Sequence, residues 1–116
     1  MAIPDYETLM LPLLKVAGER EELTVRDAIE ELAERFGLSE EEREELLPSG
    51  RQRRFDNRVS WARTYMKEAG LLQATGRGRF RITALGREVL AQKPERIDQG
   101  FLRRFPAFVE FQIRKS

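Results

Sequence analysis

One side of a predicted helix between residues 55 and 69 is the strongest constraint on the fold of this chain. Its apolar residues recur at intervals of four, three, four and three: Phe55, Val59, Ala62, Met66 and Ala69. With 3.6 residues per turn, this spacing puts all five on the same side of an α-helix. Gly70 follows at once, in the position where glycine commonly ends a helix. The pattern predicts a helix with this side buried.

A β-hairpin is predicted directly after that helix. Residues 79–83 alternate between polar and apolar side chains, which points Phe80 and Ile82 toward the core. Gly76 and Gly78 let the backbone turn sharply between the strands. Three arginines project from the hairpin: Arg77, Arg79 and Arg81. A helix followed by such a hairpin predicts a mainly α fold, a winged helix-turn-helix with a small antiparallel β-hairpin wing and extra terminal helices.

The N-terminal part contains two further helix patterns. The first follows Asp5 and ends at Gly18, and Pro12 within it predicts either a kink or a late start, because proline lacks the N–H of the helical hydrogen bond. Thr24 is the expected N-cap of the second helix, which Gly37 ends. Both helices carry an apolar stripe and are expected to pack on the core.

A short helix and a basic loop are expected before the central helix. Ser39 followed by Glu42 is a capping-box pattern, in which the two side chains satisfy free backbone N–H groups at a helix start. This helix should close at residues 46–48. Residues 49–54 then form a basic loop of turn-forming residues.

The C-terminal part combines a helix with an apolar tail. Thr83 is expected to cap a helix over residues 84–92. Seven apolar residues then crowd into thirteen positions: Phe101, Leu102, Phe105, Phe108, Val109, Phe111 and Ile113. So much apolar surface is unfavourable in water, so the tail should pack on its own domain or dock a partner subunit or a following domain. We expect one domain over residues 1–97 and an aromatic-rich segment over residues 98–116.

The charged residues divide the chain into two segments of opposite sign. The first fifty residues contain fourteen carboxylates and five basic groups. Residues 51–87 contain ten basic groups and two acids, a net charge of +8, although the whole chain carries only +1. Such a concentration of positive charge predicts a surface that binds a polyanion.

The composition excludes several classes of function. The chain has no cysteine and no histidine. Disulfides, cysteine-bearing zinc sites and histidine-dependent catalysis are therefore excluded, and no metal site, catalytic residue or cofactor is predicted. No apolar run approaches the roughly 20 residues that a membrane span needs. We expect a cytoplasmic protein without a membrane segment.

The polar side of the central helix is the first candidate site. Opposite the apolar stripe lie short or cationic side chains suited to the edges of DNA bases: Asn57, Ser60, Thr64 and Lys67. Asparagine pairs with adenine, serine and threonine serve either a base or a phosphate, and lysine reaches guanine or the backbone. The alternative is an ordinary solvated helix face.

Two aromatic residues on the flank of this helix have two possible roles. Trp61 and Tyr65 lie beside the polar side, together with Arg58. They could contact a base or a methyl group, or they could pack against the core as half-buried side chains.

The arginines around the helix and the hairpin are the second candidate site. Those expected near DNA phosphates are Arg54, Arg58, Arg63, Arg77, Arg79 and Arg81. Phosphate contacts fix the position of a protein on the duplex, whereas base contacts give specificity. The alternative for the hairpin arginines is that they only keep the surface soluble.

Three segments of the chain resemble the N-terminal domain of Mrr-type restriction endonucleases. They are IPDYETLMLPLL, LLPSGRQRRFDNRVSWARTYMKEAGLL and GRFRITALGREVLAQKPERID. The resemblance implies a winged helix-turn-helix that binds DNA and is joined to a C-terminal nuclease domain of the PD-(D/E)xK class, which cuts modified, typically methylated, DNA. The recognition helix would correspond to the run that begins at Asn57, and the wing to TGRGRFRIT.

The chain departs from that family in its second half. It has no E-x-K or Q-x-K triplet with an upstream aspartate on a strand, so the resemblance implies the DNA-targeting part of the endonuclease and not an enzyme. The expected partners are double-stranded DNA and either a covalently linked nuclease domain or a second copy of the chain.

Two other functions remain open. A stand-alone winged-helix transcription regulator would dimerise, and the tail from Phe101 would be its interface. A protein-interaction module would bind its partner through the acidic half or the tail, and its arginines would serve only solubility.

Overall fold

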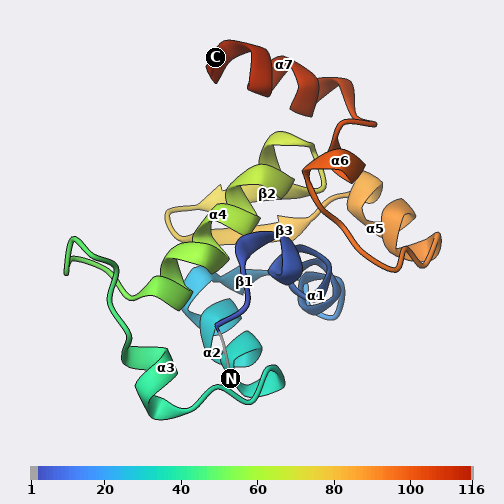
Figure 1. Cartoon of the computed structure of the whole chain (residues 1–116). Coiled ribbons are helices and arrows are strands. Elements are labelled where there is room, and N and C mark those ends of the chain that lie inside the picture. The colour runs from blue at the N-terminus through green and yellow to red at the C-terminus, as the bar shows by residue number, and fades with distance from the viewer. Residues whose placement is uncertain (1–2, 116) are drawn as a thin grey trace.

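The computed structural model describes residues 3–115 as a mainly helical domain with a small sheet (Figure 1). In chain order the elements are α1 (Tyr6–Gly18), β1 (Leu23–Thr24), α2 (Val25–Arg35), α3 (Glu40–Glu44), α4 (Arg54–Glu68), β2 (Leu72–Gly76), β3 (Arg79–Ile82), α5 (Ala84–Ala91), α6 (Gln99–Leu102) and α7 (Pro106–Lys115). In this part of the chain no helix is both long and apolar enough to cross a membrane.

The sheet confirms the predicted hairpin and adds a strand to it. β2 and β3 pair antiparallel, with Leu72 opposite Ile82, and β1 pairs with the other edge of β3, with Leu23 opposite Phe80. The strand order is therefore β1-β3-β2. β1 was not predicted, because two residues are too few to show an alternating pattern. The arrangement is compatible with a winged helix whose wing is the β2–β3 hairpin.

The core lies between α1, α4 and the sheet. All five apolar residues predicted on one side of the central helix are at most 1% exposed, which confirms the predicted buried side. α1 packs against α4, α2, α5 and β3. Leu9, Met10, Leu13 and Leu14 of α1 are all fully buried. α1 thus supports both α4 and the hairpin from the inside of the domain.

The predicted caps start the helices as expected. The Asp5 side chain accepts a hydrogen bond from the Thr8 N–H over 2.7 Å, and α1 begins at Tyr6 and runs through Pro12, so it does not start late. Thr24 accepts from the Asp27 N–H over 3.0 Å at the start of α2. These bonds satisfy N–H groups that have no partner within the helix.

The predictions for the region between α2 and α4 are confirmed in part. The capping box of Ser39 and Glu42 is present at the start of α3. However, α3 ends at Glu44 instead of closing at residues 46–48. The basic loop is also shorter than predicted, because Arg54 is the first residue of α4.

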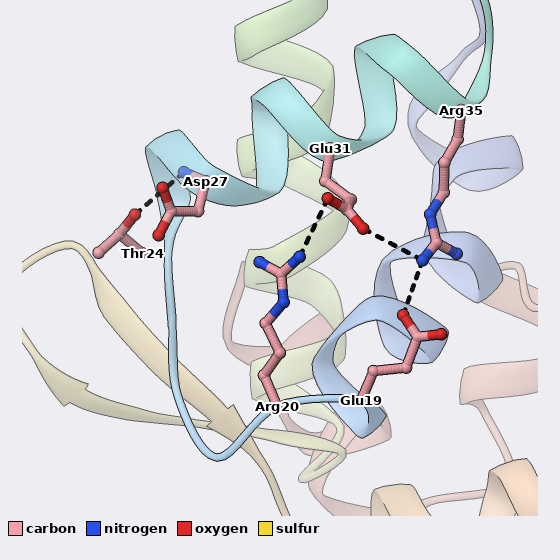
Figure 2. A network of polar contacts seen from close by, with 6 residues as sticks. All are labelled: Glu19, Arg20, Thr24, Asp27, Glu31 and Arg35. Carbon is pink, nitrogen blue, oxygen red and sulfur yellow. Dashed lines mark hydrogen bonds and ion pairs between the residues drawn. The ribbon is translucent and has the colours of Figure 1, made fainter.

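A network of charged side chains joins the turn directly after α1 to α2 (Figure 2). Glu31 accepts hydrogen bonds from Arg20 over 3.0 Å and from Arg35 over 3.2 Å, and Arg35 also donates to Glu19 over 2.7 Å. The hydrogen bond from Arg35, followed by that from Arg20, lowers the pKa of Glu31, against the effect of burial. Some acids of the N-terminal half are therefore part of the structure of the domain.

The aromatic tail packs on the rest of the domain through α6 and α7. Phe108 and Leu102 are fully buried, and the Tyr65 ring of α4 meets the Phe108 ring edge-on at a centroid distance of 5.9 Å. The Gln99 N–H donates to the Glu7 carboxylate of α1 over 2.9 Å. α7 therefore lies against one flank of α4.

Candidate nucleic-acid interface

The polar side of α4 remains open to solvent in part. Lys67 is exposed, whereas Asn57, Ser60 and Thr64 are half-buried. These four residues lie on the side of the helix away from the buried stripe, because they are offset from it by roughly half a turn. The structure thus brings the predicted base-reading residues together on one surface of the helix.

The neighbouring flank of α4 is occupied by α7. The Tyr65 ring packs among the rings of Tyr6, Trp61, Phe108 and Phe111, at centroid distances of 5.3 to 6.0 Å. The Lys115 Nζ lies 5.3 Å from the centre of the Trp61 ring, and Trp61 is still 39% exposed. Tyr65 therefore helps to hold α7 in place, and Trp61 keeps an accessible surface. A contact of either residue with a base or a methyl group stays a prediction.

The hairpin presents its three arginines as the alternation predicted. Phe80 and Ile82 are 1% and 6% exposed, whereas Arg77, Arg79 and Arg81 are all exposed. The turn closes at Gly78, whose φ of +68° lies in the left-handed region that glycine adopts most readily. The charged side chains therefore project from a hairpin anchored by its apolar face.

The partners of these arginines differ. Arg79 Nη1 lies 3.3 Å from a carboxylate oxygen of Glu22, and Arg81 Nε donates to the Gln73 side-chain oxygen over 3.4 Å. Within residues 3–115, no hydrogen bond or ion pair is found for the Arg77 side chain. A hydrogen bond from the Thr75 side chain, followed by that from Arg79, lowers the pKa of Glu22. The tip of the hairpin thus carries a cation that has no partner in the described chain.

Arg63 lies at the junction of α4 and the hairpin. Its guanidinium carbon is 6.0 Å from the centre of the Phe80 ring of β3. Its Nε is buried and has no hydrogen-bond partner among the described residues. α4 also contacts β2, so the helix and the hairpin are neighbouring elements of the domain (Figure 1).

Two further arginines predicted to contact phosphates, Arg54 and Arg58, also have partners inside the domain. Arg54 Nε lies 2.6 Å from a carboxylate oxygen of Glu45. Arg58 Nη1 donates hydrogen bonds to the main-chain carbonyl oxygens of Ile3 and Pro4, over 2.8 Å and 3.3 Å. These two arginines hold neighbouring parts of the chain together, and a role of either in DNA binding stays a prediction.

Gln52 is a neighbour of the candidate site that sequence reasoning missed. Its side-chain oxygen accepts a hydrogen bond from Asn57 Nδ2 over 3.1 Å. This bond orients the amide of Asn57 at the start of the polar side of α4. No periodic pattern could have indicated it, because Gln52 lies in the loop before the helix.

One carboxylate at the start of α4 is affected by burial. Burial raises the pKa of Asp56, and the positive charges of Arg53, Arg26 and Arg43 oppose that shift. The negative charge of Asp56 is therefore surrounded mainly by cations. Among residues 3–115, no group of three or more acidic side chains is arranged to hold a metal ion.

Comparison with known proteins gave one family and one curated relative. The family described as the Mrr N-terminal domain matches residues 6–92. The chain is similar to the type IV methyl-directed restriction enzyme EcoKMrr of Escherichia coli strain K12, with 33% identity over 96 residues. The match covers 82% of this chain but only 31% of that protein, so the chain spans less than a third of its relative's length. No solved structure gave a significant match.

Proposed function

The chain belongs to the Mrr N-terminal domain family, and from this premise we propose that it binds duplex DNA as the targeting module of a restriction endonuclease acting on modified DNA. The main support from the structure is one pairing: a helix with a partly open polar side next to a hairpin with three exposed arginines. A winged helix uses such a pair to bind a groove and its flanking phosphates.

In this proposal α4 enters the major groove. The groove of B-DNA is about 12 Å wide and accepts an α-helix, and there each base pair offers a different pattern of donors and acceptors. Asn57 would pair with the edge of an adenine, because its amide both donates and accepts. Ser60, Thr64 and Lys67 would contact nearby bases or the backbone.

The arginines of the hairpin would bind phosphates beside the groove. Arg77 makes no hydrogen bond or ion pair within residues 3–115 that would first have to break. Arg79 would exchange the Glu22 carboxylate for a phosphate at small cost, because an exposed ion pair contributes only about 0 to 1 kcal/mol. Arg81 and Arg63 would complete the phosphate contacts. Arg54 and Arg58 would act indirectly, by holding α4 and the chain before α1 in position.

Recognition of a modified base would fall to Trp61 rather than to Tyr65. The relative is named as methyl-directed, and by analogy we propose that this domain distinguishes methylated from unmethylated DNA. A methyl group is read by apolar contact in the major groove. Trp61 keeps an exposed aromatic surface next to the polar side of α4, whereas Tyr65 packs within the ring cluster.

Cleavage would belong to another domain. The matched relative is more than three times as long as the region that this chain resembles. We propose that a linked nuclease domain cuts the DNA that this module binds. The module itself would require no cofactor.

Fluorescence anisotropy tests the proposal with one labelled duplex in methylated and unmethylated form at several salt concentrations. If five cations neutralise phosphates, log Kobs should fall with log salt at a slope of about −4 to −5. Tighter binding of the methylated duplex at every salt concentration is expected. Absence of binding even at about 50 mM salt, where phosphate contacts are strong, would favour the protein-interaction module. A tight dimer in analytical ultracentrifugation with preference for a palindrome would favour the transcription regulator.

A further inference from the structure

We propose that residues 45–53 form a second basic finger, which contacts DNA phosphates beside the N-terminal end of α4. The proposal rests on the DNA binding proposed above and adds a contact element to it. The finger lies between α3 and α4 and extends away from the body of the domain, at the left of Figure 1. It is separate from the β2–β3 wing, which follows the other end of α4.

The finger is a folded hairpin and not an irregular loop. Leu46 and Arg53 form an antiparallel bridge. The Leu47 N–H donates to the Gln52 carbonyl oxygen over 2.9 Å, and the Gly50 N–H donates to the Leu47 carbonyl oxygen over 2.8 Å. Gly50 closes the turn with φ of +71°, a conformation that glycine adopts without the strain of a side chain. The geometry of the tip is therefore fixed before any ligand binds.

The base of the finger is attached to the first turn of α4. The Arg54 N–H donates to the Glu45 carbonyl oxygen over 2.8 Å, and the side chains of the same two residues form an ion pair at 2.6 Å. The hydrogen bond from Asn57 to Gln52 adds a third link, from the finger to the polar side of the helix. Placing α4 on a duplex would thus also determine where the finger lies.

The side chains of the finger suit a polyanion. Arg51 and Arg53 are exposed, and within residues 3–115 neither guanidinium group makes a hydrogen bond or ion pair, although the charge of Arg53 partly opposes the burial that raises the pKa of nearby Asp56. Most arginines of the acidic half differ in this respect, because Arg20, Arg35 and Arg43 are each paired with a glutamate. Exposed cations without partners can bind phosphates and release counterions from DNA without first losing an internal ion pair.

The position of the finger explains why the backbone beside the groove is its proposed ligand. α4 has fifteen residues and is therefore about 22 Å long. The wing contributes arginines after its C-terminal end, and the finger contributes arginines before its N-terminal end. A helix in the major groove would then have basic contacts at both ends, one set for the phosphates on each side.

Salt titration of DNA binding by the full chain tests the inference with a double variant, Arg51→Ala with Arg53→Ala. Each phosphate contact adds about 0.9 to the steepness of the log-log salt dependence, so the slope should flatten by about 1.8. Hydroxyl-radical protection should also be lost at one edge of the footprint. The matched control is Arg103→Ala with Arg104→Ala, which removes the same charge from exposed positions after α6. The control should keep the wild-type slope to within about 0.3.

Two further measurements make the outcome decisive. The variant Arg51→Lys with Arg53→Lys keeps the charges and should keep the slope, because lysine binds phosphate as a point charge. Thermal unfolding should change by no more than about 1 kcal/mol for any variant, because the altered side chains are exposed and make only surface contacts. The largest of these is the stacking of Arg104 on the Phe101 ring in the control, at 4.2 Å. If the wild type binds and Arg77→Ala flattens the slope but the finger variant matches its control, the inference fails and the proposed function stands. If the wild type does not bind DNA at low salt, both fail.

Discussion

Arg58 Nη1 in α4 donates a hydrogen bond to the main-chain carbonyl oxygen of Ile3 over 2.8 Å, in a partly buried position. The two residues are 55 positions apart in the sequence. The bond joins the segment before α1 to the central helix. An arginine expected to bind phosphate from its place on the helix flank therefore has a partner inside the domain.

We predict that Arg58→Ala reduces stability more than it changes DNA binding. A hydrogen bond from a charged group contributes about 1.5 to 3 kcal/mol, so the free energy of unfolding should fall by about that amount. The salt slope of DNA binding should stay as in the wild type. Urea unfolding and salt-dependent anisotropy measure the two effects. A flatter slope with unchanged stability would instead make Arg58 a phosphate contact.

Replacement of Arg77 at the tip of the wing is predicted to change DNA binding more than stability, the opposite of Arg58→Ala. Arg77→Ala should flatten the log-log salt slope by about 0.9, which corresponds to one phosphate contact. Stability should change by less than about 0.5 kcal/mol, because the side chain is exposed and unpaired within residues 3–115. Arg103→Ala serves as the control for the loss of one exposed charge. An unchanged slope for Arg77→Ala would remove the wing from the binding mechanism.

Gly86 in α5 is predicted to be intolerant of any side chain. A Cβ at this position would lie 2.3 Å from the Leu71 carbonyl oxygen and 2.6 Å from Ile82 Cγ1. Because backbone must move to relieve the clash, Gly86→Ala should destabilise the domain by about 1 to 3 kcal/mol in urea unfolding. Gly76→Ala is the matched control, since its nearest neighbour would be Arg79 Cδ at 3.8 Å. Equal stability of the two variants would contradict the close packing of α5 against the end of the hairpin.

The C-terminal segment is predicted to stabilise the domain through Phe108. The ring of this α7 residue is fully buried and packs against Tyr65 of α4. Phe108→Ala should therefore cost about 3 to 5 kcal/mol of unfolding free energy. Ile113→Ala removes a side chain that is 68% exposed on the same helix and should cost less than about 0.5 kcal/mol. Small effects of both substitutions in thermal unfolding would show that residues 98–116 do not fold as part of the domain.

Acid is predicted to weaken the contact between α2 and the turn after α1. The pKa of Glu31 in the folded protein is lowered from 4.5 by hydrogen bonds from Arg35 and Arg20, so the charged carboxylate favours the folded state. Its contribution is complete above about pH 4.5 and is lost as the pH falls through the lowered pKa. Asp56 acts with the opposite sign, because burial raises its pKa above 3.8 and protonation favours folding. Urea unfolding from pH 7 to pH 3 should therefore show a smaller loss of stability for Glu31→Gln than for the wild type. If the unfolding free energy of Glu31→Gln and of the wild type depended on pH in the same way, the stabilising role of the ionised Glu31 side chain would be contradicted.

Local patterns in the sequence predicted much of the fold. The spacing of apolar residues from Phe55 to Ala69 predicted both the helix and its buried side, and alternation predicted which hairpin residues face outward. Thr24 and Ser39 were predicted correctly as caps. These features are readable because each depends on residues within about one helical turn, or on every second residue of a strand.

Such local patterns could not predict contacts between residues far apart in the sequence. β1 exists because two residues at Leu23–Thr24 pair with β3, far along the chain, and a two-residue strand has no periodic signal. The polar side of α4 was visible in the sequence, but its bond to Gln52 and the packing of α7 on its flank were not.

The amino-acid order thus established the main helices and the hairpin, several caps and the sides that these elements bury, because those depend on periodicity and on neighbouring backbone groups. Only the tertiary structure determines which arginines have a hydrogen-bond partner inside the domain. Arg58 and Arg77 have the same side chain, but Ile3 lies beside the first, whereas no described acceptor binds the second. A guanidinium group bonds whichever acceptor the packing of distant elements brings near, and no local pattern encodes that neighbour.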